Sequence, residues 1–145
     1  MRYLGLDLGS TTLGISISDT TNTIASIYKT IRFKKDEYHI PLEQLGTIIK
    51  ENNITKIVLG LPKNMNNTIG ERALITLDFK EKLENKYQIE VIMEDERLTS
   101  VISNNILIQA DMSRKKRKKV VDGMASVIIL QSYLKNMKTK HLRNT

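Results

Sequence analysis

Apolar residues in the first part of the chain gather in three short runs, at residues 2–8, 13–18 and 24–33. Short apolar runs that are separated by clusters of glycine and small polar residues are typical of strands joined by turns. Here the separators are residues 9–12 and 19–23. The pattern therefore predicts three antiparallel strands that form a meander.

The rest of the chain alternates strand-like with helix-like segments. Continuous apolar runs predict buried strands at 55–61 and 89–93. The helix that opens at Pro41, with proline near its first position, runs through Ile49. Further helices are predicted at about 70–86, where Leu74, Leu77 and Leu83 set the spacing, and at 100–110 and 118–137.

These elements predict an α/β fold of one domain. We expect a mixed sheet, in which a three-strand antiparallel meander is followed by two parallel strands, with helices on both faces. A chain of 145 residues is long enough for one ordinary domain. We therefore expect a single domain over residues 1–137 and a flexible basic tail over 138–145.

Composition narrows the class of protein. The chain has no cysteine, which excludes disulfides and thiolate metal sites. Its first residues lack the apolar core of a signal peptide, so we expect a cytoplasmic protein without a membrane partner. The net charge of +7 favours a polyanionic partner, because excess Lys and Arg concentrate phosphate-bearing ligands.

Acidic residues occur at the ends of the first and last predicted strands and in the last predicted helix, where a ligand could bind. Asp7 ends the first strand, and Glu94, Asp95 and Glu96 end the last one. Ligands gather beyond the carboxyl ends of parallel strands. Asp122 precedes the apolar part of the last helix. Structural explanations stay open: Asp7 caps its strand, while the other acids favour positive helix ends.

The three positions together suit divalent cations. Hard ions such as Mg²⁺, or Mn²⁺, take carboxylate oxygens, and a pair of them can drive phosphodiester hydrolysis. We therefore expect Asp7, Glu96 and Asp122 as metal ligands, with Asp95 as a further catalytic candidate. His39 and His141 are expected on the surface.

Four blocks of sequence resemble the YqgF/RuvX family of small RNase H-like proteins, relatives of the RuvC Holliday junction resolvases. The resemblance covers nearly the whole chain, and the order and spacing of the blocks make it specific. The blocks are Gly5-Leu6-Asp7-Leu8-Gly9 with Gly14 and Ser18-Asp19, Ile57-Val58-Leu59-Gly60-Leu61-Pro62 with Asn64-Met65 and Gly70, Asp95-Glu96-Arg97-Leu98-Thr99-Ser100, and Val121-Asp122-Gly123-Met124-Ala125-Ser126.

The resemblance implies an RNase H-like sheet and a magnesium-dependent nuclease. Members of the family are described as Holliday junction resolvases or as the nuclease that matures the 5′ end of 16S ribosomal RNA. Asp7, Glu96 and Asp122 match the acidic positions of the family. The chain departs from it at Thr12, where the family usually carries Arg, and at Asn67, where it usually carries Gly. Both departures concern the substrate more than the metal.

Polar and basic residues around the acids are candidates for binding the nucleic acid. Six adjacent positive charges just before Asp122 form a block that commonly binds nucleic acid. Few aromatics are available for base stacking, so recognition by backbone and shape is expected. The candidates are Lys63, Asn64, Arg97, Thr99, Arg114, Lys115, Lys116, Arg117, Lys118 and Lys119. Arg97 serves equally well as an ion-pair partner of Glu94.

The substrate and the assembly follow from the same features. We expect RNA as the favoured partner, with DNA as an alternative, and a ribosome or pre-ribosomal particle as a further partner. No exposed apolar stripe is evident, so a monomer is favoured over the dimer that symmetric junction cutting needs.

Two other functions stay open. The segment 6–12 also resembles the phosphate loop of the actin, Hsp70 and sugar-kinase ATPases, which bind ATP between two such domains. A non-catalytic RNA-binding factor for ribosome assembly is the other, although the intact acids favour an enzyme.

Overall fold

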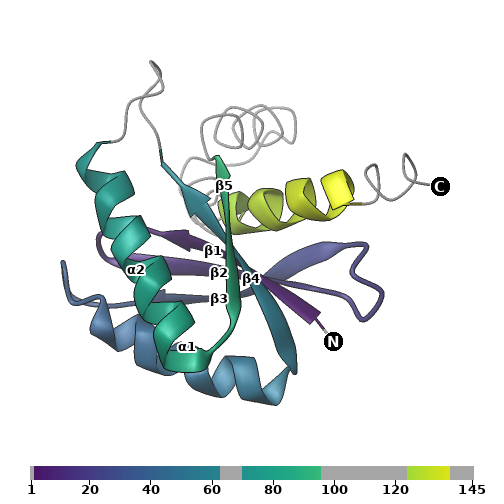
Figure 1. The fold of residues 1–145 in the computed structure, drawn as a ribbon, viewed down its shortest axis with the longest axis horizontal. Helices are drawn as coiled ribbons and strands as arrows, with labels where there is room; N and C mark the ends of the chain where they lie inside the picture. The colour runs from purple at the N-terminus through teal and green to yellow at the C-terminus, as the bar shows by residue number, and fades with distance from the viewer. Residues whose placement is uncertain (1, 63–69, 96–123, 138–145) are drawn as a thin grey trace, which may run out of the picture.

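The computed structural model describes residues 2–62, 70–95 and 124–137, which form a mixed sheet between two helical layers (Figure 1). Its strands and helices are β1 (Arg2–Leu8), β2 (Thr12–Ser18), β3 (Ala25–Arg32), α1 (His39–Glu51), β4 (Ile54–Leu61), α2 (Glu71–Tyr87) and β5 (Glu90–Asp95), followed by a helix over 124–137.

The five strands are ordered β3-β2-β1-β4-β5. β1 pairs antiparallel with β2 and β2 with β3, while β4 runs parallel to β1 and β5 parallel to β4. The predicted meander followed by two parallel strands is therefore confirmed. None of the helices in the described ranges is long and apolar enough to span a membrane.

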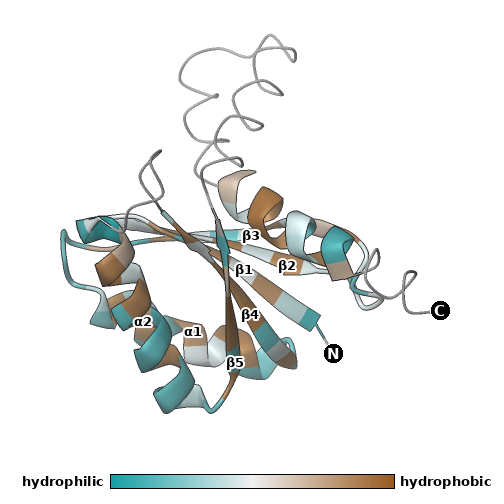
Figure 2. Cartoon of the chain, turned by 45° about the horizontal axis from the view of Figure 1, so that its top comes forward, coloured by the Kyte–Doolittle hydropathy of each residue, from teal (hydrophilic) through white to brown (hydrophobic). Residues whose placement is uncertain are grey.

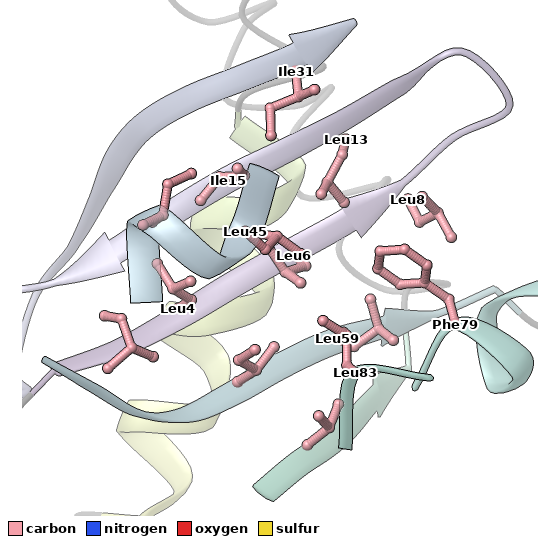
Figure 3. Packing of buried hydrophobic residues seen from close by; sticks show 14 of the residues in the cluster. Leu4, Leu6, Leu8, Leu13, Ile15, Ile31, Leu45, Leu59, Phe79 and Leu83 are labelled. Carbon is pink, nitrogen blue, oxygen red and sulfur yellow. The ribbon is translucent and has the colours of Figure 1, made fainter. Parts of the chain in front are cut away.

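Successive side chains of β1 point to opposite faces of the sheet, and each face is covered by a different helical layer. Leu4, Leu6 and Leu8 are buried on the face that α1 and α2 cover, where they pack in the main core with Leu45 and Phe79 (Figure 3). The opposite face of the sheet lies against helix 124–137 (Figure 2). The expectation of helices on both faces is confirmed. The predicted helix at 100–110, the residues 118–123 and the tail at 138–145 lie outside the described residues.

Two details of the helices differ from the expectation. α1 begins at His39, two residues before Pro41, because proline fits anywhere in a first turn whose N–H groups have no helical partner. In α2 the buried residues include Ala73 and Phe79, whereas Leu74 is 61% exposed. His39 is exposed, as expected.

Two apolar side chains are exposed at the β3 edge of the sheet. Ile24 is 62% exposed and Ile27 is 52% exposed. β3 is an edge strand, and the helical layers bury only its ends, at Ala25 and at Ile31.

Gly5 lets helix 124–137 approach the sheet closely. A Cβ at Gly5 would lie 2.7 Å from both the carbonyl oxygen of Ser126 and the Cβ of Leu130, and would also collide with Oγ of Ser16. The hydroxyl of Ser16 donates a 2.7 Å hydrogen bond to the same carbonyl oxygen of Ser126. The helix therefore packs directly against the backbone of Gly5, and it can lie this close only because Gly5 has no side chain.

Gly5→Ala should lower the free energy of unfolding by roughly 1–3 kcal/mol, because the helix has to move away from the sheet. Urea denaturation measures the change. Ser26→Ala, at an exposed position of β3, is the control and should shift stability by less than about 0.5 kcal/mol. Equal stability of the two variants would contradict the close packing at Gly5.

The turn after β2 is held by Asp19. Its carboxylate accepts hydrogen bonds from the hydroxyl of Thr21 at 2.5 Å and from the N–H groups of Thr23 at 2.7 Å and Ile24 at 3.0 Å. These donors stabilise the charged form and lower the pKa of Asp19 to about 2. The ionised carboxylate thus closes the turn between β2 and β3.

This contribution to stability should be complete above the ordinary carboxyl pKa and be lost as the pH falls through about 2. A carboxyl-carbon NMR titration of the folded protein should give the Asp19 midpoint near that value. Thr21→Val removes the hydroxyl donor and should move the midpoint upwards. A midpoint near 3.9 in the unaltered protein, the ordinary Asp value, would contradict the assignment.

Candidate functional site

Asp7 is the described member of the predicted acidic set, and it lies near the carboxyl end of β1. Its neighbours Leu6 and Leu8 are buried in the core beneath α1 and α2. Strand alternation therefore puts Asp7, like Gly5, on the face that helix 124–137 covers. The Asp7 residue is partly exposed, so an ionised carboxylate there keeps contact with solvent or a ligand.

Helix 124–137 runs along β1 in the direction opposite to the strand. Ser126 lies at Gly5, whereas the ring of Tyr133 lies 6.3 Å from that of Tyr3, nearer the start of β1. The first residues of the helix are therefore directed towards the Asp7 end of the strand. Both ribbon views place the tip of β5 beside the start of this helix (Figures 1 and 2).

The register of β4 and β5 brings a second carboxylate to the same face. Leu59 pairs with both Leu6 and Met93, and Gly60 pairs with Glu94. Since Met93 packs on the core of the α1 and α2 face, Glu94 lies on the face of Asp7. Asp7 and Glu94 thus flank Gly60, roughly 10 Å apart at their backbones by two strand spacings. Glu94 is half-buried.

The sequence places Glu94 in the acidic cluster that ends the last strand and offers it as an ion-pair partner of Arg97, but not as a metal ligand. The alternation of residues in β5 indicates on which face of the sheet Glu94 lies, but only the order of β1, β4 and β5 brings Glu94 near Asp7. A carboxylate on each side of a glycine supplies the hard oxygen donors that Mg²⁺ prefers. No group of three potential metal ligands occurs among the described residues.

The remaining predicted site residues lie largely beyond the described ranges. Asp95 pairs through its backbone with Leu61, at the end of β5. The described ranges do not include Lys63, Asn64, Glu96, Arg97, Thr99, Asp122 or the basic run from Arg114 to Lys119.

The turn that follows Asp7 is braced from two sides. Within it, the N–H of Gly9 donates to the carbonyl of Thr12 at 2.7 Å. The segment after β3 donates to its outer part, from Phe33 to the carbonyl of Thr11 at 2.9 Å and from Asp36 to the carbonyl of Ser10 at 3.3 Å. The predicted turn at 9–12 is therefore confirmed and is fixed by long-range hydrogen bonds.

Arg72 fastens the end of β1 to α2, and no pattern in the sequence marks it for this role. Its guanidinium donates to the carbonyl of Leu8 at 2.9 Å and to the hydroxyl of Tyr38 at 3.1 Å. The ring of Tyr38 packs against Phe33 with centroids 5.7 Å apart. Arg72 makes no ion pair with a carboxylate within the described residues. Its charge thus remains near the carboxyl end of β1.

Comparison with known proteins identifies the family. A family model described as RuvX, Holliday junction resolvase, matches residues 1–136. The chain belongs to the RuvX family. The resemblance found in the four sequence blocks is thereby confirmed.

Curated relatives of this RuvX-family chain match it along almost their full length. A protein of Bacillus mycoides (strain KBAB4) is 47% identical over 134 residues, which are 92% of this chain and 98% of the relative. One of Staphylococcus haemolyticus (strain JCSC1435) is 51% identical over 134 residues, covering 92% and 94%. Both carry the name "Putative pre-16S rRNA nuclease".

A solved structure supports the fold assignment. The structure of T. thermophilus RuvC in complex with Holliday junction substrate matches with a TM-score of 0.60 at 12% identity, covering 96% of this chain and 97% of that chain. The RNase H-like sheet expected from the resemblance is confirmed by this likeness, which at such low identity concerns the fold alone.

Arg72→Met should lower the free energy of unfolding by roughly 1–3 kcal/mol, because the carbonyl of Leu8 loses its side-chain donor in a partly buried place. Tyr38→Phe removes the hydroxyl that accepts from Arg72 and donates to Asp36, but it leaves the hydrogen bond to the carbonyl of Leu8 in place and should cost less. Chemical denaturation of both variants measures the difference. An Arg72→Met protein as stable as the unaltered one would show that the contact does not hold the end of β1.

Proposed function

We propose that this RuvX-family chain is a metal-dependent nuclease that matures the 5′ end of precursor 16S rRNA. The names of its relatives support the substrate. The observation that carries the proposal is the gathering of Asp7, the end of β5 and the start of helix 124–137 at one edge of the sheet. In a sheet of this kind, that edge is where ligands bind.

Asp7, Glu96 and Asp122 are the metal ligands of the proposal. Glu96 follows Glu94 by one strand period, which favours it over Asp95 for the Asp7 face. Asp122 precedes Ser126 by four residues in the sequence, and Ser126 contacts Gly5. Three carboxylates suit Mg²⁺ or Mn²⁺, and a pair of such ions supplies an activated water and stabilises the leaving oxygen.

The candidate nucleic-acid ligands keep their proposed roles. In the sequence, Lys63 and Asn64 follow β4 after Pro62, and Arg97 and Thr99 follow β5, so these residues continue the chain from the strand ends nearest the acids. The run from Arg114 to Lys119 precedes Asp122. Contacts from such residues to phosphates fix the register of the substrate and carry no sequence information.

A single strand of RNA is the favoured substrate. One small domain can direct a flexible strand to one set of acids, whereas symmetric junction cutting needs two sites related by a two-fold axis. Ile24, directly before β3, and Ile27 within it are exposed and keep a dimer open as the alternative. Cytoplasmic location and association with a pre-ribosomal particle belong to the same proposal.

The test compares labelled 5′ leader RNA, single-stranded DNA and a synthetic four-way junction, each with Mg²⁺, Mn²⁺ or chelator. We expect metal-dependent cleavage of the RNA, little cleavage of the junction, and no ATP hydrolysis. Asp7→Asn, Glu96→Gln and Asp122→Asn should each reduce the rate at least ~100-fold. Their melting temperatures should stay at or above that of the unaltered protein.

Each contrary outcome has a definite meaning. Paired symmetric nicks in the junction with untouched RNA would assign a resolvase, and RNA binding without cleavage would assign an assembly factor. ATP turnover without strand scission would assign the kinase-like alternative. Asp95→Asn is the matched control for Glu96→Gln, whereas Glu94→Gln tests whether the carboxylate beside Gly60 also takes part in metal binding. If Glu96→Gln retained activity while Asp95→Asn lost it, the ligand role would pass to Asp95.

A further inference from the structure

Three exposed cations lie at the end of the edge strand β3. Arg32 is the last residue of β3, and Lys34 and Lys35 begin the segment that leads to α1. We call these three residues the β3 basic cluster. The segment between β3 and α1 is hydrophilic in Figure 2 apart from buried Phe33.

Sheet register places the cluster near Asp7. Asp7 pairs with Gly14, and Gly14 pairs with Thr30, so the three residues form one row across β1, β2 and β3. Arg32 stands two residues beyond Thr30. The lateral distance from β1 to β3 is roughly 10 Å, or two strand spacings.

Arg32 also shares the face of Asp7. Its neighbours Ile31 and Phe33 are buried in the core on the α1 and α2 face. Strand alternation therefore directs Arg32 to the opposite face. Arg32 pairs in register with Thr12, which lies in β2 directly after the turn that follows Asp7.

The hydrogen bonds that brace this turn also fix the cluster. Phe33, between Arg32 and Lys34, donates its N–H to the carbonyl of Thr11, and Asp36, directly after Lys35, donates to that of Ser10. The backbone of the cluster is thus attached to the turn that follows Asp7.

The charges of the cluster have no carboxylate partner within the described part of the chain. The ion pairs found there are Lys56 with Glu90, Lys80 with Glu84, and Lys82 with Asp78. The three cations outnumber Asp36 and Glu37, which follow them in the chain, so the segment keeps a net positive charge that attracts phosphates. The exposed hydroxyls of Ser10 and Thr11 lie beside them and are further phosphate donors.

We propose that the β3 basic cluster binds backbone phosphates of a single RNA strand, a few nucleotides from the phosphate that lies at Asp7. The inference rests on the proposed nuclease function and adds contacts from residues other than those of the run at Arg114–Lys119. A strand that leaves Asp7 across β2 reaches the cluster at the edge of the sheet. The contacts are to phosphates, so they raise affinity equally for all sequences.

The test measures the affinity of a labelled single-stranded RNA at several KCl concentrations, in chelator to prevent cleavage. The variant Arg32→Ala, Lys34→Ala, Lys35→Ala should reduce the slope of log affinity against log salt by roughly 0.7 for each lost contact, or about 2 in all. If the two proteins bind equally at 1 M salt, this change in slope makes the variant bind up to about a hundredfold more weakly than the unaltered protein at 0.1 M salt.

The matched control is Lys50→Ala, Lys82→Ala, Lys86→Ala, which removes the same charge. Lys50 and Lys86 lie in the last turns of α1 and α2, which lead into the starts of β4 and β5, away from the Asp7 end. The control should leave the slope nearly unchanged. Lys34→Ala, Lys35→Ala, which leaves β3 intact, is the second variant in case the triple variant does not fold.

The outcomes separate this inference from the proposed function. Equal slopes for the cluster variant and the control would overturn the inference, while metal-dependent cleavage by the unaltered protein would still support the proposed function. A slope that falls with a four-way DNA junction and stays constant with RNA would also overturn it. If the unaltered protein neither bound nor cleaved RNA, the proposed function and the inference would both fail.

Discussion

The close contact between Gly5 and helix 124–137 determines how this molecule can bring distant parts of its sequence together. At Gly5 the sheet presents backbone without a side chain, and the helix approaches until the carbonyl of Ser126 accepts a hydrogen bond from Ser16. A side chain there would separate the layers. Because the helix runs antiparallel to β1, this contact directs its first residues towards Asp7.

The carboxyl end of β1 is rigid because several elements converge on it. Arg72 from α2 donates to the carbonyl of Leu8, and the segment after β3 donates to Ser10 and Thr11. A carboxylate that is to bind a metal ion has to be held in place by its surroundings. Asp7 lies one residue before this network, which suits the role that we propose for it.

Acidic and basic side chains occupy different parts of this RuvX-family chain, and this separation suggests the path of the substrate. Acidic side chains lie on the helix 124–137 face around Gly60, and the β3 basic cluster lies two strands away from Asp7. Metal ions would offset the repulsion among the acids, and cations outside the acidic centre would attract the phosphates that flank the cut. Affinity and chemistry would thus depend on different residues.

The strands, the approximate bounds of α1 and α2, the fold class and the candidacy of Asp7 as a site residue follow from the sequence alone, because period and turn residues are local properties of the chain. The sequence also carried the four blocks that mark the family. Tertiary structure decided that Glu94 flanks Gly60 opposite Asp7, that Arg72 reaches Leu8, and that Arg32 shares the face of Asp7. These relations depend on strand order and register, which arise from pairing between segments far apart in the chain and leave no periodic signal in any one of them.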